Sequence, residues 1–326
     1  MTKEEILKKL EILKNDKDDF IVISGASMVV QGVKEETGDI DIAVNDKFIK
    51  KYENISKVKK VYLGNNVYEY KDFDFSKNFY NKDEVINING YNFSTLEDVR
   101  NLKKFLNRPK DRKDITKIDL FIAKEDNLAY EKRLYKKGIT LIAGVDEVGR
   151  GPLVGPVVVA ACILPINYKL DGLTDSKKLS EKKREEFYEI IKKDAISYSF
   201  GIVDNNEIDK MNILEATKKA MKMAIEGLSV KPEHVLIDAV KLDIDVPSTS
   251  IIKGDIVSLS ISAASVLAKV ERDRMMIELD KKHPEYNFKS NKGYPTKDHM
   301  EAIKKYGILK EHRKSYGPVR DYINNK

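Results

Sequence analysis

Apolar and polar positions alternate along this chain in ways that predict short strands and amphipathic helices. In the first half, residues 20–23 form an apolar run of strand length, and residues 38–44 alternate strictly between polar and apolar side chains. In the second half, residues 139–143 and 155–164 are apolar runs rich in residues that favour strands. Residues 206–226 space their apolar side chains as one long helix does. Both halves therefore mix strands with helices.

A charged segment separates the two halves. Its few apolar side chains recur at sparse helical spacing, and it ends in Gly138. A chain of 326 residues is long for a single core and comfortable for two. We therefore predict an N-terminal domain at residues 1–123, a helical linker at 124–138 and a C-terminal domain at 139–326.

Composition narrows the function classes. Hydrophobic residues make up 41% of the chain and charged residues 34%, as in a globular protein, and no apolar run is long enough to span a bilayer. The first residues do not resemble a signal peptide, so we expect a cytoplasmic protein with no membrane partner, and we expect a monomer. The only cysteine, Cys162, excludes an intrachain disulfide and a cysteine-rich zinc site. The net charge of +6 permits a polyanionic partner without demonstrating one.

One short stretch, residues 144–152 with the sequence GVDEVGRGP, carries the densest chemistry. Asp146 and Glu147 end an apolar strand, where neighbouring carboxylates repel each other and resist ionisation unless a cation joins them. Gly149 and Gly151 lack a Cβ atom, so their backbone can adopt positive φ and bring N–H groups close to a ligand. Glycines are often plain turn residues, and acidic pairs are often solvated strand ends. The position between two apolar runs nevertheless favours a metal site.

Other polar side chains are weaker signals of chemistry. Asp238 follows a short apolar strand, and Asp273 lies on a helix whose small residues permit close packing against a sheet. Lys177, in a polar turn, would either meet the phosphates of a nucleic acid or remain solvated. His283, His299 and His312 lack the spacing of metal ligands, and we expect them at the surface; the alternative for His299, which follows Tyr294, is a place near a substrate.

The first half carries a second acidic pattern. Alternation places Asp39 and Asp41 on one face of a strand, so that their carboxylates can share a divalent cation. Residues 24–27 are a turn of small residues that opens a helix. This turn offers the backbone at Gly25 and the hydroxyl of Ser27 to a nucleoside triphosphate held by that metal.

The order of strand, small turn, helix and Asp-x-Asp resembles the nucleotidyltransferase superfamily over about residues 20–122. That superfamily needs a third carboxylate on a neighbouring strand. Glu69, Asp72, Asp74 and Asp119 are all open for this role. An acidic edge strand in an inactive or purely structural domain is the alternative.

The second half resembles ribonuclease HII over nearly all of residues 139–326. This resemblance implies a ribonuclease H-like mixed sheet flanked by helices. Together, the two resemblances predict an α/β protein in which that sheet is preceded by a smaller α/β nucleotidyltransferase-like domain. The motifs that carry the resemblance to ribonuclease HII are DEVGRGPLVGPV at 146–157, DSKKLS at 175–180, IKGD at 252–255, SAASVLAKVERDR at 262–274 and KGYPT at 292–296.

The same resemblance implies an activity and a site. The activity is endonucleolytic hydrolysis of the RNA strand of RNA–DNA hybrids, with incision 5′ of ribonucleotides embedded in duplex DNA, leaving a 5′-phosphate. Two divalent cations, Mn²⁺ or Mg²⁺, are implied. Their ligands, which are also the implied catalytic residues, are Asp146, Glu147, Asp238 and Asp273. The 2′-OH, its phosphate and the junction sugar would be contacted by Gly149, Arg150, Gly151, Ser176, Lys177 and Tyr294.

Two other functions remain open at this point. One is a nucleic-acid-binding protein with an inactive centre, although all four carboxylates are present. The other makes a nucleotidyltransferase or antitoxin-like activity of the first half the main function. Because every proposed nuclease residue follows Gly138, we expect removal of residues 1–137 to leave the nuclease active.

Overall fold

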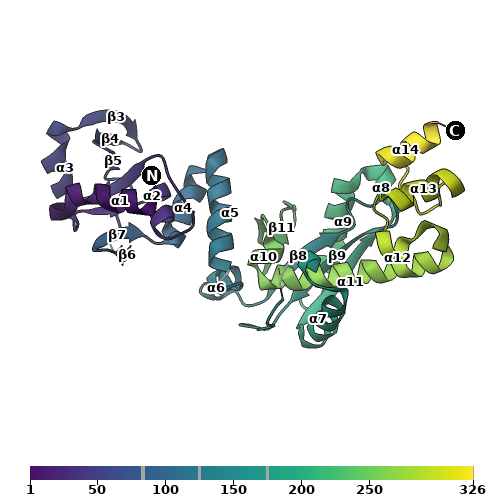
Figure 1. The fold of residues 1–326 in the computed structure, drawn as a ribbon. Helices are drawn as coiled ribbons and strands as arrows, with labels where there is room; N and C mark the ends of the chain where they lie inside the picture. The colour runs from purple at the N-terminus through teal and green to yellow at the C-terminus, as the bar shows by residue number, and fades with distance from the viewer. Residues whose placement is uncertain (82–84, 124–125, 174–175, 326) are drawn as a thin grey trace. The chain divides into compact units, whose positions relative to one another are not determined.

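The strand-forming runs of the two halves assemble into separate sheets. The structure, a computed structural model, divides into two units, Met1–Phe121 and Ile122–Lys326 (Figure 1). Both units are α/β, as predicted. Within the part of the chain that is described, no helix is long and apolar enough to cross a membrane. The described residues are 1–81, 85–123, 126–173 and 176–325.

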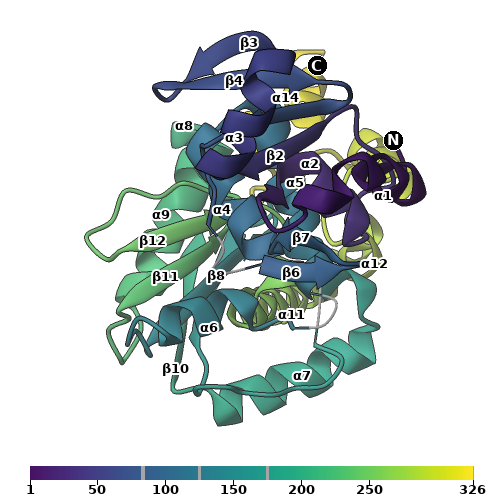
Figure 2. The ribbon, with the colours of Figure 1, turned by 90° about the vertical axis from the view of Figure 1, so that its left-hand side faces the viewer.

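In the described residues of the first unit, seven strands form one mixed sheet in the order β3-β4-β5-β2-β1-β7-β6. Figure 2 labels β2, β3, β4, β6 and β7 of this sheet. The predicted strand at 38–44 is β2 (Ile40–Val44), which pairs antiparallel with β1 (Phe20–Val22) and parallel with β5 (Phe73–Ser76). The other strands are β3 (Lys57–Tyr62), β4 (Asn65–Tyr70), β6 (Val85–Ile88) and β7 (Tyr91–Ser94). The helices are α1 (Lys3–Leu10), α2 (Ser24–Val30), α3 (Asp46–Tyr52), α4 (Leu96–Leu106) and α5 (Pro109–Ala123).

The second unit has a five-stranded mixed sheet in the order β10-β9-β8-β11-β12. Its central strand is β8 (Ile142–Val148), which pairs antiparallel with β9 (Val157–Ile163) and parallel with β11 (His234–Asp238). β10 (Ser197–Val203) extends the sheet beyond β9, and β12 (Ser248–Ile251) extends it beyond β11.

Helices cover both faces of this second sheet (Figure 1). α9 (Ile213–Glu226) packs on one face, and α11 (Leu259–Lys282) packs on the other together with α7 (Glu181–Asp194). α11 lies so close to β8 that a Cβ atom added to Gly144 would be 2.0 Å from the backbone of Ser260. The remaining helices are α6 (Ala129–Tyr135), α8 (Asn205–Met211), α10 (Gly254–Val257), α12 (Phe288–Asn291), α13 (Lys297–Tyr306) and α14 (Gly317–Asn324).

Two predicted elements differ in the structure. The single helix predicted at 206–226 is two helices, α8 and α9. They are separated at Asn212, whose φ is +75° and whose side chain accepts from the N–H groups of Leu214 and Glu215. Asparagine tolerates positive φ and caps helices, so it ends one helix and begins the next.

The segment predicted as a linker contains helix α6, but it is not a separate tether. The second unit begins at Ile122, and Glu131 of α6 is fully buried within it. Lys124 and Glu125, with which the predicted linker begins, lie outside the described residues. Leu128 and Tyr130 are buried as well, and Leu128 belongs to a core cluster of the second unit.

Candidate active site

Three acidic residues lie at the same edge of the second sheet. Asp146 and Glu147 lie near the end of β8, and Asp238 ends β11, which runs parallel to β8. The carboxyl ends of neighbouring parallel strands open at the same edge. Burial raises the pKa of Asp146 well above its usual value, and the negative charges of Glu147 and Asp238 raise it further. The carboxylates at this edge are therefore close enough for their negative charges to act on one another.

The surroundings of Glu147 indicate that the carboxylates at this edge are suited to binding a divalent cation. Burial raises the pKa of Glu147, and its Oε1 lies 3.2 Å from Nη1 of Arg150. Its Oε2 is buried and has no hydrogen-bond partner among the described residues. A buried acceptor without a donor is costly, whereas a divalent cation would both satisfy it and offset the repulsion from Asp146. Carboxylate oxygens are the ligands that Mg²⁺ and Mn²⁺ prefer.

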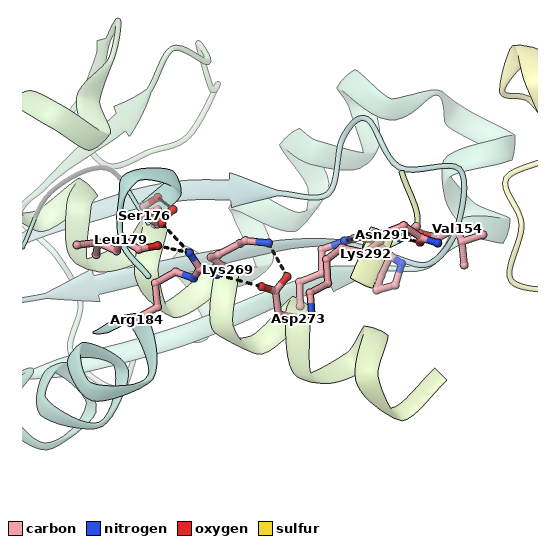
Figure 3. Close-up of polar contacts among 12 residues, drawn as sticks. Val154, Ser176, Leu179, Arg184, Lys269, Asp273, Asn291 and Lys292 are labelled. Atoms are coloured by element: carbon pink, nitrogen blue, oxygen red, sulfur yellow. Dashed lines mark hydrogen bonds and ion pairs between the residues drawn. The ribbon is translucent and has the colours of Figure 1, made fainter. Parts of the chain in front are cut away.

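Asp273 on α11 is engaged by cationic side chains (Figure 3). Nζ of Lys269 donates to its Oδ1 at 2.5 Å, and Nη2 of Arg184 lies 3.8 Å from its Oδ2. Asp238 accepts from the N–H of Gly254 at 2.7 Å. Among the described ranges, no three His, Cys, Asp or Glu side chains lie close enough together to hold one ion.

The turn that contains Ser176 and Lys177 is hydrogen-bonded to α11 and α7. The hydroxyl of Ser176 lies 2.9 Å from that of Ser265 on α11. Nη1 of Arg184 donates to the carbonyls of Ser176 and Leu179, at 3.2 and 2.6 Å (Figure 3). Lys177 is exposed, and its positive charge is among the influences that lower the pKa of Glu147. Thr174 and Asp175 lie outside the described residues.

The loop at residues 149–151 lies beside Tyr294. Gly149 has a φ of +93°, and Arg150 and Gly151 are exposed. A Cβ atom added to Gly151 would be 3.2 Å from the ring of Tyr294, which is 43% exposed. The structure thus brings the predicted substrate-contacting glycines and tyrosine together, at the end of the strand that carries Asp146.

The prediction that His299 and His312 lie at the surface is wrong. Both are fully buried, and their Nε2 atoms are 3.3 Å apart. Nδ1 of His299 lies 2.9 Å from the carbonyl oxygen of Tyr294, so this pair supports the backbone of the exposed tyrosine. Sequence reasoning also missed Arg272 and Arg313, both fully buried. Arginine is rarely buried without partners, and this chain's motifs did not reveal those partners.

The first unit brings Asp41 and Asp74 together. They are opposite each other in the parallel pairing of β2 and β5, and both line a cavity of about 350 Å³ with Ser24, Tyr62 and Arg108. Burial, together with the negative charges of Asp39 and Asp74, raises the pKa of Asp41 to about 6. Of the four candidates for a third carboxylate, Asp74 is the one whose negative charge acts on Asp41. It is also held by Nζ of Lys59 at 2.7 Å.

Other predicted residues of this N-terminal site lie differently. Ser27 is fully buried and its hydroxyl donates to the carbonyl of Ser94 at 2.7 Å, so it is not turned to a ligand. Asp39 is exposed and precedes β2 rather than lying within it. Gly25 is buried, and a Cβ atom there would meet Oγ1 of Thr37 at 2.6 Å. The strand begins two residues later than alternation predicted, so Asp41 lies within β2 whereas Asp39 lies just before it.

Comparison with known proteins matches both halves of the chain. Residues 143–318 match the family described as ribonuclease HII, and residues 3–148 match a family described as nucleotidyltransferase of unknown function. The chain is 59% identical to ribonuclease HII of Bacillus cytotoxicus over 197 residues, which cover 60% of this chain and 76% of the relative. It is 54% identical to ribonuclease HII of Bacillus thuringiensis over 225 residues, covering 65% of this chain and 88% of the relative.

The comparisons also bear on the fold and on the extent of the second unit. Ribonuclease H2 from Pyrococcus horikoshii superposes with a TM-score of 0.50 at 27% identity, covering 56% of this chain and 97% of that one. The two Bacillus matches are longer than residues 139–326 of this chain, so they extend upstream into the segment that contains α6.

Proposed function

Because the chain belongs to the ribonuclease HII family, an endonuclease family acting on RNA–DNA hybrids, we propose that it also incises duplex DNA 5′ of an embedded ribonucleotide. The cut leaves a 5′-phosphate. The observation that carries the proposal is the buried, unpartnered Oε2 of Glu147 beside Asp146. Every residue of the proposed site lies in one unit of one chain, so a monomer suffices for this function.

Asp146, Glu147, Asp238 and Asp273 would hold two divalent cations, Mn²⁺ or Mg²⁺. When bound, such a pair supplies an activated water and stabilises the leaving 3′ oxygen, so no nucleophilic side chain is needed. Lys269 and Arg184 keep Asp273 in a fixed position on α11 through its two oxygens. The buried walls of β8 and α11 limit the water around these carboxylates and strengthen their interactions.

Recognition of the ribonucleotide is assigned to the loop at Gly149–Gly151 with Tyr294. The 2′-OH distinguishes RNA from DNA, and backbone N–H groups approach it closely where side chains are absent. The exposed ring of Tyr294, next to Gly151, offers a flat surface for the sugar at the junction. Ser176 and Lys177 would contact the neighbouring phosphates.

Incubation with a DNA duplex containing one ribonucleotide tests the proposal. With Mn²⁺ or Mg²⁺ we expect one cut, 5′ of the ribonucleotide, and a 5′-phosphate product. The same duplex without the ribonucleotide, and the same reaction in chelator, are the controls. A cut at another position, or incision independent of divalent metal, would contradict the proposed chemistry.

A second candidate function is favoured by the pairing of Asp41 and Asp74 across β2 and β5. We propose that this unit binds a nucleoside triphosphate with a divalent cation in the cavity that these carboxylates line. Calorimetric titration of the full chain with ATP and GTP plus Mg²⁺ tests it. Asp41→Asn and Asp74→Asn should abolish binding, whereas Asp72→Asn, whose carboxylate pairs with Lys9, should not. No binding by the wild-type protein would refute this candidate.

A further inference from the structure

Arg313 fixes the Gly149–Gly151 loop from its buried side. Its Nη2 donates to the carbonyl of Gly149 at 2.6 Å, and its Nη1 donates to the carbonyl of Arg150 at 3.1 Å. Its Nε donates to the carbonyl of Gly155 at 2.9 Å. The side chain is fully buried. A planar guanidinium presents its donors in a rigid fork, so these bonds fix the loop in position as well as in orientation.

Tyr316 completes this anchor. Its hydroxyl donates to the carbonyl of Arg150 at 2.5 Å and accepts from Nη1 of Arg313 at 2.9 Å. The carbonyl of Arg150 therefore has two donors on the inner side of the loop. Both donors come from a C-terminal segment more than 160 residues away in sequence.

A second buried arginine, Arg272, binds the segment that follows the loop. Arg272 donates to the carbonyls of Val154 and Pro156, at 3.0 and 3.1 Å, and to that of Lys292 at 2.9 Å. It also explains the absence of a side chain at Gly149, where a Cβ atom would be 2.3 Å from Nε of Arg272. Lys292 is two residues before Tyr294, so the loop and the tyrosine share one support.

Because the peptide bond is planar, holding a carbonyl in place also fixes the direction of the N–H group that follows it. In a trans peptide, the carbonyl of one residue and the N–H of the next point to opposite sides. No cis peptide bond occurs among the described residues. With the carbonyls of Gly149 and Arg150 held inward, the N–H groups of Arg150 and Gly151 point outward. Both residues are exposed on that side, beside Tyr294.

We propose that Arg313, together with Tyr316, is a positioning residue that aims the N–H groups of Arg150 and Gly151 at the ribonucleotide of the substrate. The inference rests on the proposed function of this loop. It assigns the C-terminal segment a part in distinguishing ribonucleotide from deoxyribonucleotide, separate from holding the cations.

Binding without divalent metal isolates this role from catalysis. Fluorescence anisotropy of the full chain in chelator would compare a labelled duplex carrying one ribonucleotide with the matched all-DNA duplex. Arg313→Lys keeps the charge but loses the fork, and we expect it to lower the ratio of the two affinities about tenfold, given the size of a hydrogen bond to a charged group. Tyr316→Phe removes one hydroxyl, and we expect a loss of about threefold. Affinity for the all-DNA duplex should not change.

Tyr306→Phe, at an exposed tyrosine of the same C-terminal region, is the matched control and should keep the wild-type ratio. Hydrogen exchange of the peptide that covers residues 149–151 should become faster in both test variants. If Arg313→Lys does not fold, Tyr316→Phe carries the test. If the folded variants keep the wild-type ratio of the two affinities, this inference is wrong, but the proposed function stands. If the wild-type protein itself binds both duplexes equally well, this inference and the proposed recognition of ribonucleotides are both wrong.

Discussion

Asp146 holds a buried carboxylate whose ionisation is opposed by burial, by Glu147 and by Asp238. In the protein without metal, this repulsion destabilises the folded state. The same residues thus trade stability for the capacity to bind cations. This arrangement is typical of functional sites, where perturbed acidic groups gather.

Asp146→Asn separates these two effects. Without metal, we expect the melting temperature to stay equal or rise, because one opposing charge is gone. We expect Mn²⁺ to raise the melting temperature of the wild-type protein, and we expect Asp146→Asn to lose this shift. The cleavage rate should fall about a thousandfold or more, since several kcal/mol of charge stabilisation are removed. Thermal scans with and without Mn²⁺, with the exposed Asp171→Asn as control, measure this. A variant that keeps the metal shift would contradict the assignment.

His312 makes stability depend on pH. Burial lowers its pKa to about 3, with a further contribution from His299, whereas an unfolded histidine titrates near about 6.5. Below pH 6.5 the unfolded chain therefore binds a proton that the folded chain excludes. Stability is fully present above that pH and falls as the pH decreases, by up to about 1.4 kcal/mol per pH unit.

Urea unfolding of the full chain between pH 7.5 and 5 measures the slope. His312→Gln should make the dependence shallower, because one of the groups that take up a proton on unfolding is removed; His299, whose pKa burial also lowers, remains. His283→Gln is the control, since that residue is only half-buried. An unchanged slope in His312→Gln would mean that other groups cause the pH dependence.

At the scale of elements, α6 is joined to the beginning of α11 through Glu131. Its Oε1 accepts from the hydroxyl of Ser258 at 2.7 Å and from the N–H of Ser260 at 3.0 Å. Ser258 is the N-cap of α11, and Asp273 lies on the same helix. A carboxylate at a helix N-terminus satisfies donors that the helix itself cannot. Glu131 therefore connects the segment before β8 to a helix of the proposed site.

Glu131→Ala should lower the free energy of unfolding of the second unit by about 1–3 kcal/mol, because two buried donors lose their acceptor. Glu131→Gln keeps an acceptor oxygen and should lose less. Denaturant midpoints of the full-length variants measure both. Equal midpoints for Glu131→Ala and the wild-type protein would show that water or another group replaces the carboxylate.

At the scale of the whole molecule, the boundary between the units decides which truncation is tolerated. The second unit begins at Ile122 and contains α6, so removal of residues 1–121 should leave cleavage of a ribonucleotide-containing duplex within about twofold of the full chain. Removal of residues 1–137, which the sequence suggested as harmless, also removes Glu131. We expect the protein without residues 1–137 to unfold at a lower temperature than the protein without residues 1–121, and to lose its activity at a lower temperature on heating.

Parallel thermal scans and cleavage assays of the two truncated proteins provide the measurement. Equal stability of both would mean that α6 adds nothing to the nuclease. Loss of activity in the shorter deletion, with the protein still folded, would mean that the first unit contributes to the site.

Local patterns were enough to predict several features of this protein. Strand-length apolar runs located β8 and β9, strict alternation located β2, and the small residues of α11 predicted its close packing on a sheet. The position of Asp146 and Glu147 after an apolar run predicted a charged strand end. The ordered motifs of the second half led to the ribonuclease HII family. Each of these signals lies within a few consecutive residues, because strand and helix periodicity act over that distance.

Only the tertiary structure decided the contacts between distant segments. It paired Asp74 with Asp41, turned Ser27 away from the ligand side, and buried Glu131 against α11. It also buried Arg313 and His312 beneath the loop and tyrosine proposed to bind the substrate. The sequence could not show these contacts, because burying a charged or polar side chain is favourable only when specific partners are present. Those partners are chosen by the packing of the whole unit.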